Sequence, residues 1–240
     1  MPDTMTQPVV LSEFSVTEAL SVGWEVVKKD WLSLLVAAII YALATQVPVA
    51  IFQVVLGKQG PAAFLGVGLG MLWSVFMMIG LIRYMLALVR GQRPELGVLF
   101  SGADRYVTML LVYIPFMVVV GFGMMLLIVP GIYLATKFAF AMVLIADGKS
   151  DGFDAFSKSS RMTEGRQLTL VLYYLVAAAM IIGGFMLVII PGVVASMVVG
   201  VGTFLLYEFA LANQQVNMPQ PAMSQPQPPS APQPPVPPTM

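Results

Sequence analysis

Two apolar segments of the chain are too long to be single membrane-spanning helices, and each is interrupted once by a Pro-Gly pair. The segments are residues 106–146 and 168–212, and the pairs are Pro130 with Gly131 and Pro191 with Gly192. A helix of about 40 residues is about 60 Å long, twice the roughly 30 Å hydrocarbon core of a bilayer. Proline removes a helical donor, and glycine permits a reversal. We therefore predict that each pair forms the tight turn of a helical hairpin. The alternative is a kink within one continuous helix.

Composition also indicates a membrane protein. Of the 240 residues, 58% are hydrophobic and only 10% are charged, and the mean hydropathy is +0.87. A soluble domain carries about 25% charged residues, so this chain has too few to cover a surface that faces water. The sequence therefore predicts an all-α polytopic membrane protein with six transmembrane helices. The predicted spans are approximately 31–56, 61–89, 106–129, 131–146, 168–190 and 192–212.

Basic residues are concentrated on one side of the predicted spans. Of the twelve, only Lys58 falls on the other side, and Arg83 and Lys137 lie inside spans. The positive-inside rule makes the basic side cytoplasmic. Residues 1–14 are then a cytoplasmic N-terminal segment, residues 15–213 are the transmembrane domain, and both termini are cytoplasmic.

Each predicted hairpin follows a short segment that resembles an interfacial helix. Ser15 and Glu18 form a capping box before the first, Pro94 suits the first helical position before the second, and Asp154 begins the third. We interpret these as three copies of one unit, an elbow helix followed by a transmembrane hairpin. Chance similarity among membrane hairpins is the alternative. The apolar elbow residues expected at headgroup level are Leu20, Trp24, Val27, Phe153 and Phe156.

Residues from about 94 to 213 resemble an uncharacterised group of bacterial six-helix membrane proteins related to the membrane domain of some glycerophosphodiester phosphodiesterases. The resemblance rests on "VPGIYLATKFAFAMVLIADGKSDGFDAFSKSSRMTEGR" and on the second "IPGVV". The matching positions are Pro130, Gly131, Lys137, Asp154, Ala155, Ser159, Glu164 and Gly165. It implies a bacterial inner-membrane location. It implies no catalysis, because the phosphodiesterase domain needs histidines and metal-binding carboxylates.

The residue inventory also argues against an enzyme. The chain has no cysteine and no histidine, which removes thiolate chemistry, imidazole bases and the usual zinc ligands. Gly148, Lys149 and Ser150 do not complete a phosphate-binding loop, because position 143 is Val143. The eighteen methionines are better explained as packing side chains than as a copper path. We expect no cofactor, no metal and, at zero net charge, no nucleic-acid partner.

Three charged residues are predicted to lie within the bilayer: Arg83, Lys137 and Glu208. Charges at such depth usually face the protein interior and find partners. Counting residues from the cytoplasmic ends places Lys137 near the midplane and Arg83 and Glu208 at similar shallower levels. We therefore predict an ion pair between Arg83 and Glu208. Lys137 would snorkel, bind carbonyls freed at the Pro-Gly break, or compete for Glu208.

The C-terminal tail, residues 214–240, is rich in proline and glutamine and carries no charge. Such a segment cannot bury a core and is predicted to be disordered with polyproline II character. Overlapping P-x-x-P frames suit an aromatic groove on a partner, and a solubilising spacer is the alternative. The frames are formed by Pro229, Pro232, Pro235 and Pro238.

These observations predict a non-enzymatic scaffold or partner subunit of the membrane, which presents its elbows and tail to cytoplasmic or membrane proteins. A small permease or channel, with a path lined by the intramembrane charges, is the alternative.

Overall fold

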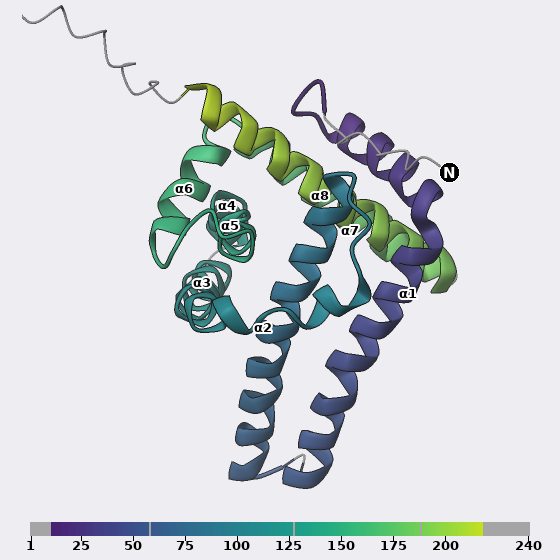
Figure 1. Ribbon diagram of the computed structural model, residues 1–240. Helices are drawn as coiled ribbons and strands as arrows, with labels where there is room; N and C mark the ends of the chain where they lie inside the picture. Colours follow the sequence, from purple (N-terminus) through teal and green to yellow (C-terminus); the bar gives the residue numbers. More distant parts are fainter. Residues whose placement is uncertain (1–10, 58, 127, 188, 218–240) are drawn as a thin grey trace, which may run out of the picture.

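The computed structural model describes residues 11–57, 59–126, 128–187 and 189–217, and all regular structure in these ranges is helical (Figure 1). The helices are α1 Val16–Leu56, α2 Pro61–Val89, α3 Tyr106–Leu126, α4 Ile128–Lys137, α5 Ala141–Ala146, α6 Asp154–Thr163, α7 Gln167–Leu187 and α8 Ile189–Asn217, with two 3-10 helices, η1 Leu96–Phe100 and η2 Ala103–Arg105. Five segments are long and apolar enough to cross a membrane, and residues 131–146 form a shorter apolar stretch. The all-helical class and the long apolar helices of a multi-pass membrane protein are confirmed.

The first elbow and the first span form a single helix, α1, which bends at Asp30. The backbone of Asp30 leaves helical geometry, with φ of −120° and ψ of 28°, and the ribbon changes direction there (Figure 1). At the N-terminus the Ser15 hydroxyl accepts the backbone N–H of Glu18 at 3.2 Å, as predicted for a capping box. The Glu18 carboxylate does not return to Ser15. It accepts the N–H groups of Ser12 and Glu13 instead, so only half of the box forms.

Both Pro-Gly pairs lie in the first turn of the second helix of a hairpin, and not in the turn itself. Helix α3 ends at Leu126 and α4 begins at Ile128, while α7 ends at Leu187 and α8 begins at Ile189. The prediction that the pairs are the turns was therefore wrong by a few residues. The physical reason is that the first helical turn needs no N–H from proline.

The glycine of each pair allows the two helices of its hairpin to touch. A Cβ on Gly123 would lie 3.0 Å from the Cα of Gly131, and a Cβ on Gly184 would lie 2.8 Å from the Cα of Gly192. Residues eight apart in a straight helix would be about 12 Å apart. The chain therefore reverses at both places, which excludes the continuous kinked helix.

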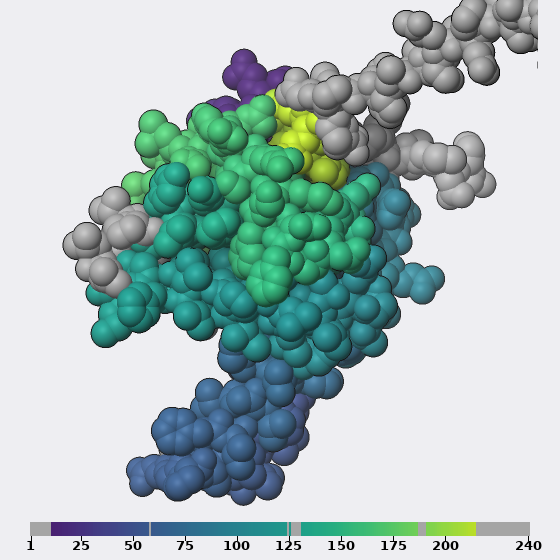
Figure 2. Space-filling view, turned by 90° about the vertical axis from the view of Figure 1, so that its left-hand side faces the viewer, coloured from purple at the N-terminus to yellow at the C-terminus, as the bar shows by residue number. Residues whose placement is uncertain are grey.

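The hairpin of α1 and α2 projects from the rest of the molecule (Figures 1 and 2). Its two helices approach closely at Gly66 and Gly70, where an added Cβ would meet the carbonyl oxygen of Phe52 and the side chain of Val49 at 3.3 Å. The small residues of α2 thus form the inner face of the hairpin, as expected for small residues spaced by four.

The predicted fourth span and the second elbow differ from expectation. Residues 138–140 interrupt the span, which divides into α4 and α5. The second elbow forms the 3-10 helices η1 and η2. It packs closely on α2, because a Cβ on Gly80 would collide with the backbone of Leu99. Only the third elbow is a separate α-helix, α6. Helix α8 continues to Asn217, past the predicted domain end at 213.

The main core is formed by buried residues of α1, α2, α3, α5, α7 and α8. All six residues of α5 are buried, and the rings of Phe140 and Tyr207 pack edge to face, 5.7 Å between centroids. The N-terminal part of α1 crosses α8 at two glycines: a Cβ on Gly23 would lie 2.9 Å from the Val198 carbonyl oxygen, and one on Gly202 would lie 3.1 Å from that of Ala19. The first and last helices of the chain are therefore in direct contact.

Candidate functional site

The most concentrated polar chemistry of the described chain is a charge cluster at the end of α2. Its centre is Arg90, which follows the last residue of α2. Both terminal nitrogens of Arg90 donate to the carboxylate of Asp147 at 2.7 Å, and the guanidinium also binds the Glu208 carboxylate at 2.7 Å. Asp147 follows α5 and Glu208 lies on α8, so this one arginine joins three hairpins.

Asp147 is the most buried member of this group, with a side chain only 6% exposed. One of its oxygens accepts the hydroxyl of Tyr207 at 3.0 Å in addition to a nitrogen of Arg90. A buried carboxylate that lost these donors would be strongly destabilising. The hydrogen bonds to Asp147 in turn raise the pKa of the Arg90 guanidinium above its ordinary value, so the arginine stays charged.

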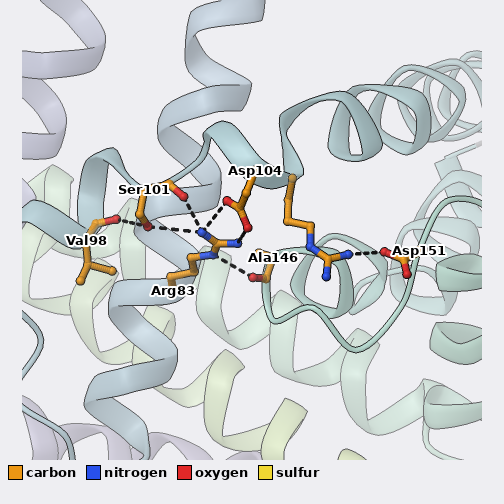
Figure 3. A network of polar contacts seen from close by, with 7 residues as sticks. Arg83, Val98, Ser101, Asp104, Ala146 and Asp151 are labelled. Atoms are coloured by element: carbon orange, nitrogen blue, oxygen red, sulfur yellow. Dashed lines mark hydrogen bonds and ion pairs between the residues drawn. The ribbon is translucent and has the colours of Figure 1, made fainter.

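Arg83 lies seven residues before Arg90 on the same face of α2 and forms a second group (Figure 3). Its two terminal nitrogens donate to the two oxygens of Asp104 at 2.8 and 2.7 Å. Its Nε donates to the carbonyl oxygen of Ala146 at 3.0 Å, and a terminal nitrogen also donates to the carbonyl oxygen of Ser101. Arg83 thus ties the second elbow and the end of α5 to α2.

The Arg83 guanidinium lowers the pKa of the Asp104 carboxyl below its ordinary value, chiefly through the hydrogen bonds between the two side chains. Arg105 beside it forms an ion pair with Asp151, in the segment between α5 and α6 (Figure 3). A cavity of about 310 Å³ opens among these groups and is lined by Arg83, Arg90 and Arg105 together with Asp104 and Asp147.

A second polar arrangement closes the break between α4 and α5. The hydroxyl of Ser159, on α6, donates to the carbonyl oxygen of Lys137 at 3.1 Å and accepts the N–H of Phe140 at 3.2 Å. The hydroxyl of Thr163 lies 3.2 Å from the same carbonyl oxygen. Ser159 and Thr163 are both buried, so α6 supplies the partners that the interrupted helix lacks.

The predicted ion pair between Arg83 and Glu208 is wrong. Glu208 binds Arg90, and Arg83 binds Asp104. Lys137 joins neither group: its ammonium lies 5.9 Å from the centre of the Tyr133 ring, and its carbonyl, not its side chain, receives the hydroxyls of α6. The three residues predicted as one network therefore belong to three separate arrangements.

The predicted elbow residues lie in varied surroundings. Val27 is buried, because the first elbow packs on α8, whereas Trp24 is 45% exposed and lies beside the ammonium of Lys28. Phe153 is exposed and stacks on Phe156, 6.4 Å between ring centres. Leu20 packs at the edge of the core. Their depth in a bilayer stays a prediction. Pro229, Pro232, Pro235 and Pro238 lie outside the described residues.

Sequence reasoning missed Asp104, Asp147 and Tyr207 because partners were sought only among charges inside the spans. Two signals in the sequence point to them. Arg83 and Arg90 are seven residues apart and so share a helix face, and Asp104 and Asp147 stand at the ends of neighbouring apolar segments.

Comparison of the chain with models of protein families, with curated proteins and with solved structures found no match.

Proposed function

We propose that the protein is a non-enzymatic scaffold or partner subunit of the inner membrane, with both termini in the cytoplasm. One observation above all supports the proposal. The acidic side chains of the charge cluster are held by arginines of the same chain, and each arginine joins different hairpins. The ion pairs of the cluster thereby connect the hairpins to one another, which is a structural role.

The outward faces of the long helices also favour this proposal. Helix α3 exposes an apolar stripe at helical spacing, and α7 does the same. The exposed residues are Val107, Leu111, Ile114, Val118 and Phe122 on α3 and Leu168, Leu172, Leu175 and Ile182 on α7. Such stripes are suited to contact with lipid or with the helices of another membrane protein.

The orientation proposed rests on the basic residues. Arg90 follows the last residue of α2, and Lys158 and Arg161 belong to α6. The end of α2 and helix α6 both lie away from the turn between α1 and α2 (Figure 1). By the positive-inside rule this end faces the cytoplasm. The elbows and the C-terminal end of α8 would then be accessible to cytoplasmic partners.

Transport is the alternative function, and the cavity of about 310 Å³ among the clustered charges favours it. A polar cavity beside Arg90, Asp147 and Glu208 offers both signs of charge to a small polar solute or a proton. In that case the ion pairs would open and close during transport.

Co-purification from native membranes tests the scaffold proposal. We would compare the full chain, a chain without residues 219–240, and a full-length chain in which Pro229, Pro232, Pro235 and Pro238 are replaced by alanine. A partner retained in fixed ratio by the full chain, and lost from both variants, is the expected result. The alanine variant controls for tail length.

A transport function would give a different result. If no protein accompanies the full chain in fixed ratio, while liposomes with the purified protein take up solute and lose this uptake with Glu208→Gln, the protein is a transporter.

A further inference from the structure

A cavity of about 800 Å³ lies beside the bend of α1, where α1, the end of α2 and the segment after it meet. It adjoins the cavity of the charge cluster, with which it shares Gln92, but none of the clustered charges lines it. One part of its wall is apolar and includes Leu32, Val36, Leu88 and Leu96. The other part carries charge, from Lys29, Asp30 and Arg93. The cavity is therefore amphipathic, with its charged part at the junction between a polar elbow and an apolar helix.

The two basic side chains of this cavity make no hydrogen bond or ion pair within the described part of the chain. This distinguishes Lys29 and Arg93 from their neighbours: Lys28 binds Glu25 at 2.6 Å, and Arg90 binds two carboxylates. Asp30 partly offsets them, which leaves one net positive charge on the lining. That charge matches a ligand that carries a single negative charge.

The apolar wall is open to the surroundings of the helices. Leu32 is 59% exposed, and Val36 and Leu96 are also exposed. A hydrocarbon chain could enter from the membrane and lie against these side chains without leaving the apolar phase. Cavities of about 300–1,000 Å³ accommodate ligands of this size class.

We propose that this cavity binds one anionic glycerophospholipid. Its phosphate lies between Lys29 and Arg93, and one acyl chain follows the wall of Leu32, Val36 and Leu88. Basic pockets between membrane helices on the cytoplasmic side are suited to anionic headgroups. The site goes beyond the scaffold role and does not depend on it, because it involves neither the tail nor the charge cluster.

The ligand is a lipid and not a free anion, because charged residues line only one part of the cavity and apolar residues line the rest. A soluble phosphate would leave the apolar wall of the cavity uncovered. A lipid uses both parts at once: beside the bend at Asp30, Lys29 lines the same cavity as Leu32 and Val36, which follow one and two turns further along α1.

Native mass spectrometry of the purified full-length protein tests the proposal. Phosphatidylglycerol and phosphatidylcholine with identical acyl chains would be titrated onto the protein in detergent. We expect one molecule of phosphatidylglycerol to bind, and to bind more tightly than phosphatidylcholine. Replacing both basic residues, Lys29→Gln with Arg93→Gln, should weaken its binding roughly thirty-fold, which corresponds to about fivefold for each basic residue near a headgroup.

The matched control is Lys28→Gln with Arg161→Gln, which removes the same charge from exposed positions outside the cavity and should leave binding unchanged. Ser33→Phe, which fills the cavity and keeps its charged residues, should weaken the binding of both lipids. Glycerol 3-phosphate should not compete. Thermal unfolding of each variant would show that it is folded.

Three results would overturn the proposal. They are equal binding of the two lipids by the original chain, full binding by the folded Lys29 and Arg93 double variant, and competition by glycerol 3-phosphate at the concentration of the lipid.

Discussion

Ser159 and Lys137 are joined by a hydrogen bond of 3.1 Å from the hydroxyl of one to the backbone carbonyl of the other. The bond connects α6, which is an elbow, to the break inside a predicted span. The same hydroxyl accepts the N–H of Phe140. The elbow is therefore packed into the hairpin before it, and is not merely the entrance to the hairpin after it.

The first prediction concerns this bond. Ser159→Ala would leave the N–H of Phe140 without the hydroxyl that accepts it, while the Lys137 carbonyl would keep the hydroxyl of Thr163. We expect the substitution to destabilise the protein by about 1–3 kcal/mol. Ser157→Ala, on an exposed turn of the same helix, is the control and should be near neutral. The measurement is unfolding by heat or denaturant in detergent. Equal stability of the two variants would show that the break does not depend on Ser159.

The second prediction separates the observed ion pair from the one expected by residue counting. Arg90→Gln and Glu208→Gln should be coupled by about 0.5–3 kcal/mol in a double-mutant cycle, because the side chains touch. Arg83→Gln and Glu208→Gln should be additive within about 0.5 kcal/mol, because they share no partner. Coupling in the second cycle and additivity in the first would contradict the cluster described here.

The third prediction uses two adjacent glycines of α7. A Cβ on Gly184 would lie 2.8 Å from the Cα of Gly192, whereas a Cβ on Gly183 would meet nothing within 4 Å. Gly184→Ala should therefore push the hairpin apart and cost about 1–3 kcal/mol. Gly183→Ala should be neutral or stabilising by up to about 1 kcal/mol, since alanine favours helix. Thermal unfolding of the two variants side by side is the measurement.

The fourth prediction is a pH dependence. Arg83 lowers the pKa of Asp104 in the folded chain. In the unfolded chain this aspartate has a pKa of about 3.9, so the folded chain binds the proton of Asp104 less readily. The stabilisation is thus complete above that value and is lost as pH falls through the lowered folded pKa. Because the Asp104 side chain is 58% exposed, the effect should be small.

The comparison that isolates this effect is Asp104→Asn. The original chain should be the more stable of the two at pH 7, and the two melting temperatures should converge in acid below pH of about 4. A difference that persists unchanged at low pH would show that the carboxylate charge contributes nothing.

The fifth prediction concerns topology. The chain has no cysteine, so single cysteines can be introduced without background. A cysteine at position 58 (Lys58 itself lies outside the described residues) should react with an impermeant reagent on intact cells. Cysteines in place of Arg93, Ser157 and Asn217 should react only after the membrane is opened. Reaction at position 157 from outside would reverse the proposed orientation.

Hydropathy alone predicted α2 to the residue, because its apolar run begins at Pro61, ends before Arg90 and contains only one charged residue, Arg83. It could not predict the break at 138–140, where no proline or glycine stands. That break follows from the buried hydroxyls of α6, which become neighbours only through the tertiary fold. The depth of Lys137 in a bilayer stays a prediction.

The pairing of charges failed for a geometric reason. Arg83 and Glu208 were judged to be at similar levels, but Glu208 binds Arg90, which lies on the same face of α2 two turns beyond Arg83. Arg83 binds Asp104 and Ala146 instead. Counting residues from the predicted ends of the spans does not show which elements lie beside a side chain in the folded chain.

The contact of Gly23 with α8 has a consequence for how the protein is made. The elbow that contains Gly23 is synthesised well before α8, which carries Val198 and Gly202 and against which the elbow packs. It therefore cannot dock until α8 has left the ribosome. A chain interrupted before α8 would lack the surface on which this elbow packs.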